Sequence, residues 1–302
     1  AGRCVRILPG RNRAVSALAV ADDGALALLQ GDRTLRLFDR ELRPRGAAED
    51  AHARASRALV WLPGSQALLS GSLDGTARLW KAGSGEPRLA ASWRLSAACH
   101  ALALEPGGER FAAGLEDGSI ELLRLADGAR LGSVRAHAGP VYALAWSPEG
   151  SWLASGSRDT RIVLYAADGS RRCLGGHRDP VLCLDWSADG ARLASGGRDA
   201  VGRIWDRAGR CLAELRGHRL TIWGIGFSPD GRRIATSSFD TDVRIWDASD
   251  GRCVAVLRGH TREVSSLCWA RDGRLLTGSR DGSVRVWDAA GRCSRAIVPH
   301  AP

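Results

Sequence analysis

A phrase of eight residues recurs seven times along this chain of 302 residues. Its clearest copies are DGSVRVWD, DTDVRIWD and DAVGRIWD, which end at Asp288, Asp247 and Asp206. The seventh residue of the phrase, usually aromatic, falls at positions 38, 80, 123, 165, 205, 246 and 287. An aspartate stands six positions earlier in every copy, at 32, 74, 117, 159, 199, 240 and 281. Steps of 40 to 43 residues suit a repeated unit of four β-strands.

Each copy is predicted to form four short strands. Runs such as VLCLDW (181–186) and VSSLCW (264–269) are apolar and rich in strand-forming residues. They end in the phrases SPEG, SADG, SPDG and ARDG, which suit tight turns between strands. A second apolar strand, the VRIW strand and a more polar fourth strand follow. No segment keeps a helical period, so we predict an all-β chain whose three apolar strands are buried between neighbouring sheets.

The recurring Gly-His, Asp and Trp-Asp elements resemble the WD40 repeat family over nearly the whole chain. The resemblance implies one seven-bladed WD40 β-propeller over residues 1–302, with four antiparallel strands per blade around a central channel. One blade cannot bury both of its faces alone, whereas a closed ring buries all of them. The expected blades are residues 10–46, 51–93, 95–134, 136–174, 176–215, 217–257 and 259–298, with residues 2–8 as a further outer strand.

The two ends of the chain carry the same outer-strand phrase. Residues 2–8 read GRCVRIL, and residues 291–298 read GRCSRAIV. The two segments compete for one edge of the last blade, and residues 291–298 reach it with less loop closure. We nevertheless expect residues 2–8 there, because pairing between the far ends closes the ring. Since the sequence also contains no methionine, we expect further WD40 repeats or other domains in a longer chain.

Five copies carry a histidine, a serine or threonine, an aspartate and an aromatic ring at matched spacing. They are His52, Ser70, Asp74 and Trp80; His137, Ser155, Asp159 and Tyr165; His177, Ser195, Asp199 and Trp205; His218, Thr236, Asp240 and Trp246; and His260, Thr277, Asp281 and Trp287. These residue types match a catalytic triad, but five equivalent active sites in one domain argue against an enzyme. The resemblance implies a structural tetrad whose polar groups satisfy one another between blades. We predict no enzymatic activity.

Two copies keep only the aspartate of this set. Arg11, Leu28 and Phe38 take the other three places in blade 1, and Leu95, Ala113 and Leu123 take them in blade 3. Replacing the polar groups together avoids leaving half of a network unsatisfied. In blade 4 we expect the phenol of Tyr165 to replace the indole as a hydrogen-bond donor.

The formal net charge is +10, and arginine carries almost all of the positive charge. Such a charge is typical of a protein with a negatively charged partner. A general compositional bias towards arginine is the simpler explanation. No apolar run approaches the length that spans a membrane, so we expect no membrane interaction.

The eight cysteines form no C-x-x-C pair and no zinc-binding spacing. Four of them recur in GRC phrases, namely Cys4, Cys211, Cys253 and Cys293. We predict that the cysteines are small apolar fillers in a reducing, cytoplasmic compartment. There is also no phosphate-binding glycine loop, so we expect neither a metal nor a cofactor.

Partner binding is expected at the rim of the channel, where WD40 proteins often bind. The resemblance places two positions per blade there: the residue after the first apolar residue of the inner strand, and the residue before the recurring aspartate. The candidate residues are Arg57, His100, Tyr142, Arg158, Leu182, Arg198, Trp223, Phe239 and Arg280. Aromatic side chains with arginines are typical of interface hot spots and of carboxylate or phosphate recognition. We expect an acidic or phosphorylated peptide or protein segment over blades 4–7.

Three alternatives stay open. The aromatic residues could pack against neighbours while the arginines are solvated. The basic surface could bind RNA or DNA, although the recurring arginines at positions 36, 78, 203, 244 and 285 share one phase and indicate a structural use instead. The domain could also be a structural or regulatory sensor within a larger signalling ATPase, kinase or scaffold.

Overall fold

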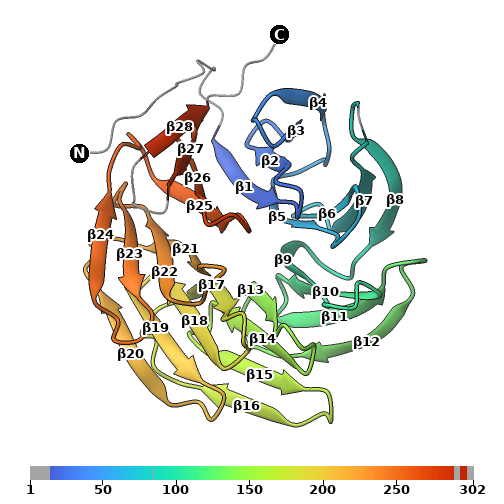
Figure 1. Cartoon of the computed structure of the whole chain (residues 1–302). Coiled ribbons are helices and arrows are strands. Elements are labelled where there is room, and N and C mark those ends of the chain that lie inside the picture. Colours follow the sequence, from blue (N-terminus) through green and yellow to red (C-terminus); the bar gives the residue numbers. More distant parts are fainter. Residues whose placement is uncertain (1–13, 84, 289–292, 298–302) are drawn as a thin grey trace.

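The computed structural model describes residues 14–83, 85–288 and 293–297. All regular structure in this part of the chain is β-strand, arranged as seven antiparallel sheets of four strands around a central axis (Figure 1). The predicted seven-bladed, all-β propeller is therefore confirmed. None of the described residues forms a helix that could cross a membrane.

The sheets are numbered as blades 1–7 in chain order. Blades 1–4 contain β1 (Val15–Val20), β2 (Leu26–Gln30), β3 (Leu35–Phe38) and β4 (Pro44–Ala48); β5 (Ser56–Trp61), β6 (Ala67–Ser72), β7 (Thr76–Lys81) and β8 (Arg88–Arg94); β9 (Cys99–Leu104), β10 (Arg110–Leu115), β11 (Ser119–Arg124) and β12 (Arg130–Arg135); and β13 (Val141–Trp146), β14 (Trp152–Ser157), β15 (Ile162–Ala166) and β16 (Arg171–Leu174). Blades 5–7 contain β17 (Val181–Trp186), β18 (Arg192–Gly197), β19 (Val201–Asp206) and β20 (Cys211–Arg216); β21 (Ile222–Phe227), β22 (Arg233–Ser238), β23 (Val243–Asp247) and β24 (Cys253–Leu257); and β25 (Val264–Trp269), β26 (Leu275–Ser279), β27 (Val284–Trp287) and β28 (Cys293–Ile297).

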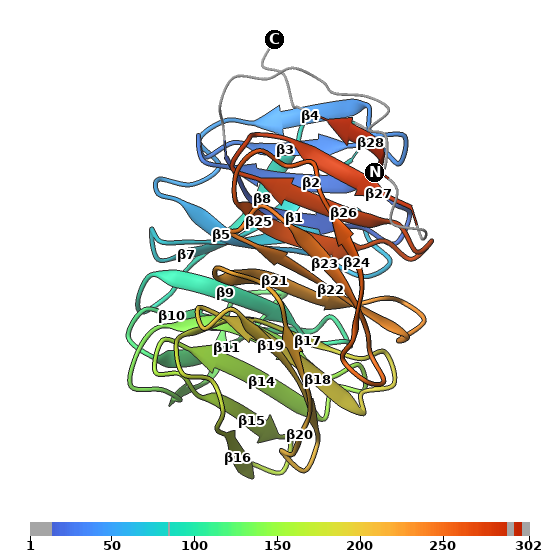
Figure 2. The same cartoon turned by 90° about the vertical axis from the view of Figure 1, so that its left-hand side faces the viewer.

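Within each blade the strands pair in sequence order. The first strand lies at the channel and the fourth lies at the periphery (Figure 1), and Figure 2 shows the same ring from its side. The first three strands are largely buried, whereas β12 is exposed along its whole length. This gradient follows from the ring, because only the inner part of each sheet is covered by neighbours on both faces.

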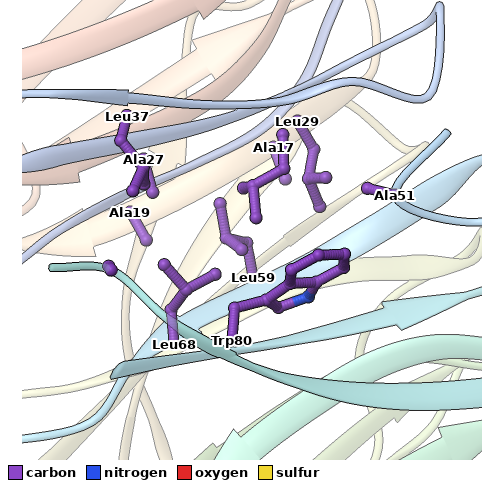
Figure 3. Packing of buried hydrophobic residues seen from close by; sticks show 11 residues of the cluster. Ala17, Ala19, Ala27, Leu29, Leu37, Ala51, Leu59, Leu68 and Trp80 are labelled. Atoms are coloured by element: carbon purple, nitrogen blue, oxygen red, sulfur yellow. The ribbon is translucent and has the colours of Figure 1, made fainter. Parts of the chain in front are cut away.

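Apolar clusters between adjacent blades form the core. Leu29 and Leu37 of blade 1 pack against Leu59, Leu68 and Trp80 of blade 2, as Figure 3 shows. Blade 1 also contributes Ala17, Ala19 and Ala27, so small and large side chains together fill the space between the two sheets. Each cluster belongs to two blades, so the blades depend on one another for stability.

The seam between blades 7 and 1 is closed in the same way. Val15 and Leu28 pack against Leu276 and Val286, and the hydroxyl of Ser265 donates to the carbonyl of Val15. The outer position beside β27 is occupied by β28. The expectation that residues 2–8 pair there is therefore wrong, because β28 takes that edge. Residues 2–8 themselves lie outside the described residues.

The recurring aspartate has the same local role in all seven blades. Its Oδ1 accepts the backbone N–H two residues later, for example at 3.1 Å between Asp32 and Thr34 and at 3.0 Å between Asp117 and Ser119. The equivalent pairs are Asp74 and Thr76, Asp159 and Arg161, Asp199 and Val201, Asp240 and Asp242, and Asp281 and Ser283. This side-chain turn fixes the connection into the third strand. It explains why blades 1 and 3 keep the aspartate without its tetrad partners.

The five histidine-containing sets form tetrads as expected in four blades. In blade 5, His177 Nδ1 donates to Asp199 at 3.0 Å, and its Nε2 accepts the hydroxyl of Ser195 at 2.7 Å. The indole N–H of Trp205 donates to the same hydroxyl at 2.8 Å. The same series joins the residues of blades 2, 6 and 7.

Blade 4 departs from the expectation. Its His137, Ser155 and Asp159 are linked as in the other blades. The Tyr165 hydroxyl is buried and has no hydrogen-bond partner among the described residues, so the prediction that it replaces the indole donor is wrong. The carbonyl of Val163 lies 3.3 Å from the same Ser155 hydroxyl, which donates its proton to His137 at the shorter distance of 2.8 Å.

The cysteines divide into two groups. Cys99 and Cys183 are buried, and burial raises the pKa of Cys99 to about 12. They fit the role of small apolar fillers. Cys173, Cys211 and Cys253 lie on the outer strands of blades 4, 5 and 6 and are exposed, so the filler prediction is wrong for these three positions.

Two aspartate substitutions distinguish the contribution of the tetrad to stability from that of the turn. Asp199→Ala removes the acceptor of His177 as well as the turn, whereas Asp117→Ala removes only an exposed turn. We expect Asp199→Ala to lower the free energy of unfolding by about 1–3 kcal/mol more than Asp117→Ala does, because it leaves a buried donor unpaired. Urea unfolding of the two variants measures the difference, and equal losses would contradict this role of the tetrad.

Stability is expected to fall between about pH 6.5 and pH 4. Burial lowers the pKa of His52 to about 4 and also lowers that of His137 and of His260. The unfolded chain therefore binds protons in this range that the folded chain does not, and the free energy of unfolding decreases as the pH falls. Thermal unfolding followed by circular dichroism at pH 7, 6, 5 and 4 measures this decrease.

Blade 3 supplies a matched control for the pH effect. The triple variant His52→Leu, Ser70→Ala and Trp80→Leu gives blade 2 the apolar set that blade 3 carries at Leu95, Ala113 and Leu123. Its midpoint temperature should depend less steeply on pH than that of the unaltered chain. An unchanged slope would show that His52 does not contribute to the loss of stability.

Candidate functional site

Each inner strand contains a β-bulge near its start. In β21, Ile222 pairs with Ser238 and Gly224 with Ser237, so Trp223 has no partner across the strand pair. The same skip occurs in the other six blades. The skipped residues are Ser16, Arg57, His100, Tyr142, Leu182, Trp223 and Ser265. A bulge redirects a side chain out of the regular alternation, and here it presents one side chain per blade at one end of the channel.

This end of the channel, which we call the rim mouth, opens into a cavity of about 630 Å³. All seven bulge residues line the cavity, together with Arg158, Arg198 and Phe239. Eight of the nine candidate residues therefore share one cavity, and the ninth, Arg280, contacts Phe239 beside it. That these residues bind a partner stays a prediction.

The deeper wall of the cavity is an aliphatic girdle, which the sequence analysis missed. It consists of the residue two positions after each bulge: Leu18, Leu59, Leu102, Leu144, Leu184, Ile225 and Leu267. An uninterrupted column of leucine and isoleucine at the fourth position of the inner strands is the signal that could have revealed it. The rim mouth thus combines a polar edge with an apolar floor, as is common in ligand pockets.

A stack of aromatic rings and arginines spans part of the rim mouth. The rings of Trp223 and Phe239 lie 5.0 Å apart and are nearly parallel, at 10°. The guanidinium of Arg57 lies 5.8 Å from the centre of the Trp223 ring, and that of Arg280 lies 4.8 Å from the centre of the Phe239 ring. Arg57 belongs to β5, on the opposite side of the channel from β21 (Figure 1). Cation–π contacts therefore connect blades 2, 6 and 7 across the mouth.

Two further arginines have free guanidinium groups. Arg158 and Arg198 occupy equivalent positions in blades 4 and 5, where their backbone N–H groups donate to the carbonyls of Pro140 and Pro180 at 3.0 and 2.9 Å. Both side chains are exposed, and neither forms an ion pair with any carboxylate of the described residues. The backbone holds each arginine in place while its charge stays available.

His100 forms a separate polar cluster at the rim mouth. Its Nε2 bonds to Glu116, and its ring meets that of Tyr142 edge-on at 5.1 Å. Burial lowers the pKa of His100 although Glu116 raises it, and the nearby charge of Arg57 lowers it further. Nδ1 is buried without a hydrogen-bond partner in the described part of the chain. His100 is therefore held neutral at pH 7 in the free protein.

Comparison with known families agrees with this architecture. The family model described as WD domain, G-beta repeat matches residues 49–81, 128–165, 169–206, 209–247 and 251–288, more than half of the chain. The chain belongs to the WD40 repeat family. WD40 propellers typically mediate protein interactions and are generally non-catalytic. The five matches end in or directly after the third strands of blades 2, 4, 5, 6 and 7, the blades that carry the tetrad histidine.

A search of curated proteins finds no match to this WD40 chain. Its rim mouth must therefore be interpreted from its own residues. Among the described residues, no three histidine, cysteine or acidic side chains lie close enough together to hold a metal ion.

The proximity of Arg57 to His100 is testable. We expect Arg57→Gln to raise the pKa of His100, because it removes a positive charge that disfavours the imidazolium. The measurement is an NMR titration of the His100 ring protons. Arg158→Gln is the matched control and should leave this pKa unchanged. An equal effect of both variants would contradict a local contact at Arg57.

Proposed function

We propose that this WD40 propeller is a non-catalytic interaction module that binds an acidic or phosphorylated segment of a partner protein at the rim mouth. The observation that carries the proposal is the pair of exposed, unpaired arginines, Arg158 and Arg198, in one cavity with the half-buried rings of Trp223 and Phe239. Guanidinium groups bind carboxylate and phosphate with two parallel hydrogen bonds. Aromatic rings beside them add contact area at little entropic cost.

The aliphatic girdle restricts the partner further. A side chain that enters the cavity between the arginines meets Leu144 and Leu184, which line its floor. The segment that fits best has an apolar side chain next to its acidic or phosphorylated residue. The cavity of about 630 Å³ accommodates a few side chains.

The tetrads support a non-catalytic role. A serine nucleophile must be reachable by substrate, but the hydroxyl-bearing residues Ser195 and Thr236 are completely buried. The hydroxyl of Ser195 also receives the indole N–H of Trp205, which would oppose its activation as a nucleophile. Their Ser-His-Asp arrangement stabilises blade packing.

Nucleic acid is the second candidate partner, favoured by the net charge of +10. Several arginines that contribute to this charge serve the fold: Arg78 donates to the carbonyl of Ala51 at 2.6 Å, and Arg203 pairs with Asp199 at 2.8 Å. The charge that remains at the rim mouth suits one or two anionic groups better than a long phosphate backbone. Gel shifts at several salt concentrations distinguish the two, since binding to a phosphate backbone weakens steeply with salt.

Selection from a peptide library tests the proposal. We expect the enriched peptides to carry an acidic or phosphorylated residue beside an apolar one. The double variant Trp223→Ala with Arg198→Glu should bind them at least about tenfold more weakly, because it removes an aromatic contact and a charge-assisted hydrogen bond.

A double variant at the periphery serves as the control. Leu131→Ala with Arg171→Glu makes the same charge change on the exposed outer strands β12 and β16 and should bind like the unaltered chain. Enrichment of peptides without acidic or phosphorylated residues, or equal binding by both double variants, would refute the rim mouth as an anion-binding site.

A further inference from the structure

The end of the channel opposite the rim mouth, which we call the far mouth, contains one unexpected side chain. The fifth residue of the inner strand is small or apolar in six blades: Ala19, Val60, Ala103, Ala145, Gly226 and Cys268. In blade 5 it is Asp185. A carboxylate in an otherwise apolar column is costly unless something compensates its charge.

Asp185 borders a cavity of about 330 Å³ at the far mouth, between blades 5, 6 and 7. Its Oδ2 accepts the backbone N–H of Phe227 at 2.7 Å, which fixes the carboxylate across the blade boundary. The indole of Trp269 lies in the same cavity. The site is therefore a cavity with one fixed polar group and one aromatic wall.

Trp269 and Asp185 both lie next to Gly226. A Cβ on Gly226 would lie 3.1 Å from Cδ1 of Leu267, 3.4 Å from Cδ1 of Trp269 and 3.8 Å from Oδ2 of Asp185. The indole and the carboxylate therefore approach the same point on β21. The indole is itself fixed, because its N–H donates to the carbonyl of Gly226 at 3.1 Å.

The charge of Asp185 has no counter-ion in the described part of the chain. Burial raises the pKa of its carboxyl to about 7. By contrast, Asp22 in the neighbouring cavity of about 260 Å³ is paired with Arg271 at 2.7 Å. The backbone N–H groups of Phe227 and Trp186 satisfy only part of the acceptor capacity of a carboxylate, so the Asp185 carboxylate can accept further hydrogen bonds.

We propose that the far mouth binds a single organic cation, an alkylammonium or guanidinium group, with Asp185 as its counter-ion and Trp269 as an aromatic wall. A bound cation supplies the charge and the hydrogen-bond donors that Asp185 lacks. Aromatic surface favours such cations over a hydrated metal ion. The cavity has the size of a small-ligand site.

This site is independent of the rim mouth. The girdle residues Ile225 and Leu267 lie between the two cavities, and the arginines of the rim mouth repel cations. The cation comes either from a free amine or from a lysine or arginine side chain of a partner. Both sources present the same chemistry to Asp185.

Titration with n-butylammonium tests the proposal. The readout is the indole ¹H–¹⁵N resonance of Trp269, assigned with a Trp269→Phe variant. We expect a saturable shift that n-pentanol, an uncharged molecule of similar shape, does not produce. Equal binding of the alcohol would overturn the proposal, because it would show an apolar cavity without charge recognition.

Two substitutions locate the counter-ion. Asp185→Asn keeps an acceptor for Phe227 and should weaken butylammonium binding by about tenfold or more, the effect of losing a hydrogen bond to a charged group. Asp22→Asn removes the same charge from the neighbouring cavity and should leave the affinity unchanged. Unchanged affinity in Asp185→Asn, or equal losses in both variants, would refute Asp185 as the counter-ion.

Stability gives a second readout that does not depend on the resonance assignment. Butylammonium should raise the Tm of the unaltered chain and not that of Asp185→Asn. A peptide Ac-Gly-Lys-Gly-NH₂ and butylguanidinium serve as further probes. Tighter binding of the peptide than of butylammonium indicates a partner's side chain as the source, and the reverse indicates a free amine. Failure of all three cations to bind would overturn the proposal, while leaving the rim mouth unaffected.

Discussion

The burial of both faces of every blade is the constraint on which this structure depends. A single four-stranded sheet leaves apolar side chains on two faces, and only a neighbour on each side can cover them. The seam shows the strength of this requirement, since Val15 and Leu28 of blade 1 meet Leu276 and Val286 of blade 7 directly. Ring closure is thus a consequence of face-to-face packing, and the order of the outer strands is secondary to it.

The architecture was predictable from the sequence because the repeat recurs seven times at nearly constant spacing. An aspartate in constant register with an apolar or aromatic residue six positions later fixed the number of blades before any strand was located. The turn that each aspartate makes explains that constancy, including in blades whose tetrads are missing. Polar groups were harder to predict: Tyr165 carries a donor of the right type, but nothing in its spacing shows whether its hydroxyl reaches Ser155.

The candidate site was only partly predictable. The positions of the rim residues follow from the repeat, but their contacts depend on tertiary geometry. The stacking of Trp223 on Phe239 and the reach of Arg57 across the channel join residues from blades that are distant in sequence. The expectation that residues 2–8 take the last edge was also wrong. It assumed that pairing between the far ends closes the ring, whereas packing between blades 7 and 1 already closes it.

The aliphatic girdle has a further consequence for how the propeller works as a component of an assembly. The seven hydrocarbon side chains of the girdle line the rim mouth, and two of them, Ile225 and Leu267, also line the far mouth, so apolar side chains lie between the polar groups of the two ends. The rim mouth carries arginine side chains and the far mouth carries the Asp185 carboxylate, so the two ends of the channel suit groups of opposite charge.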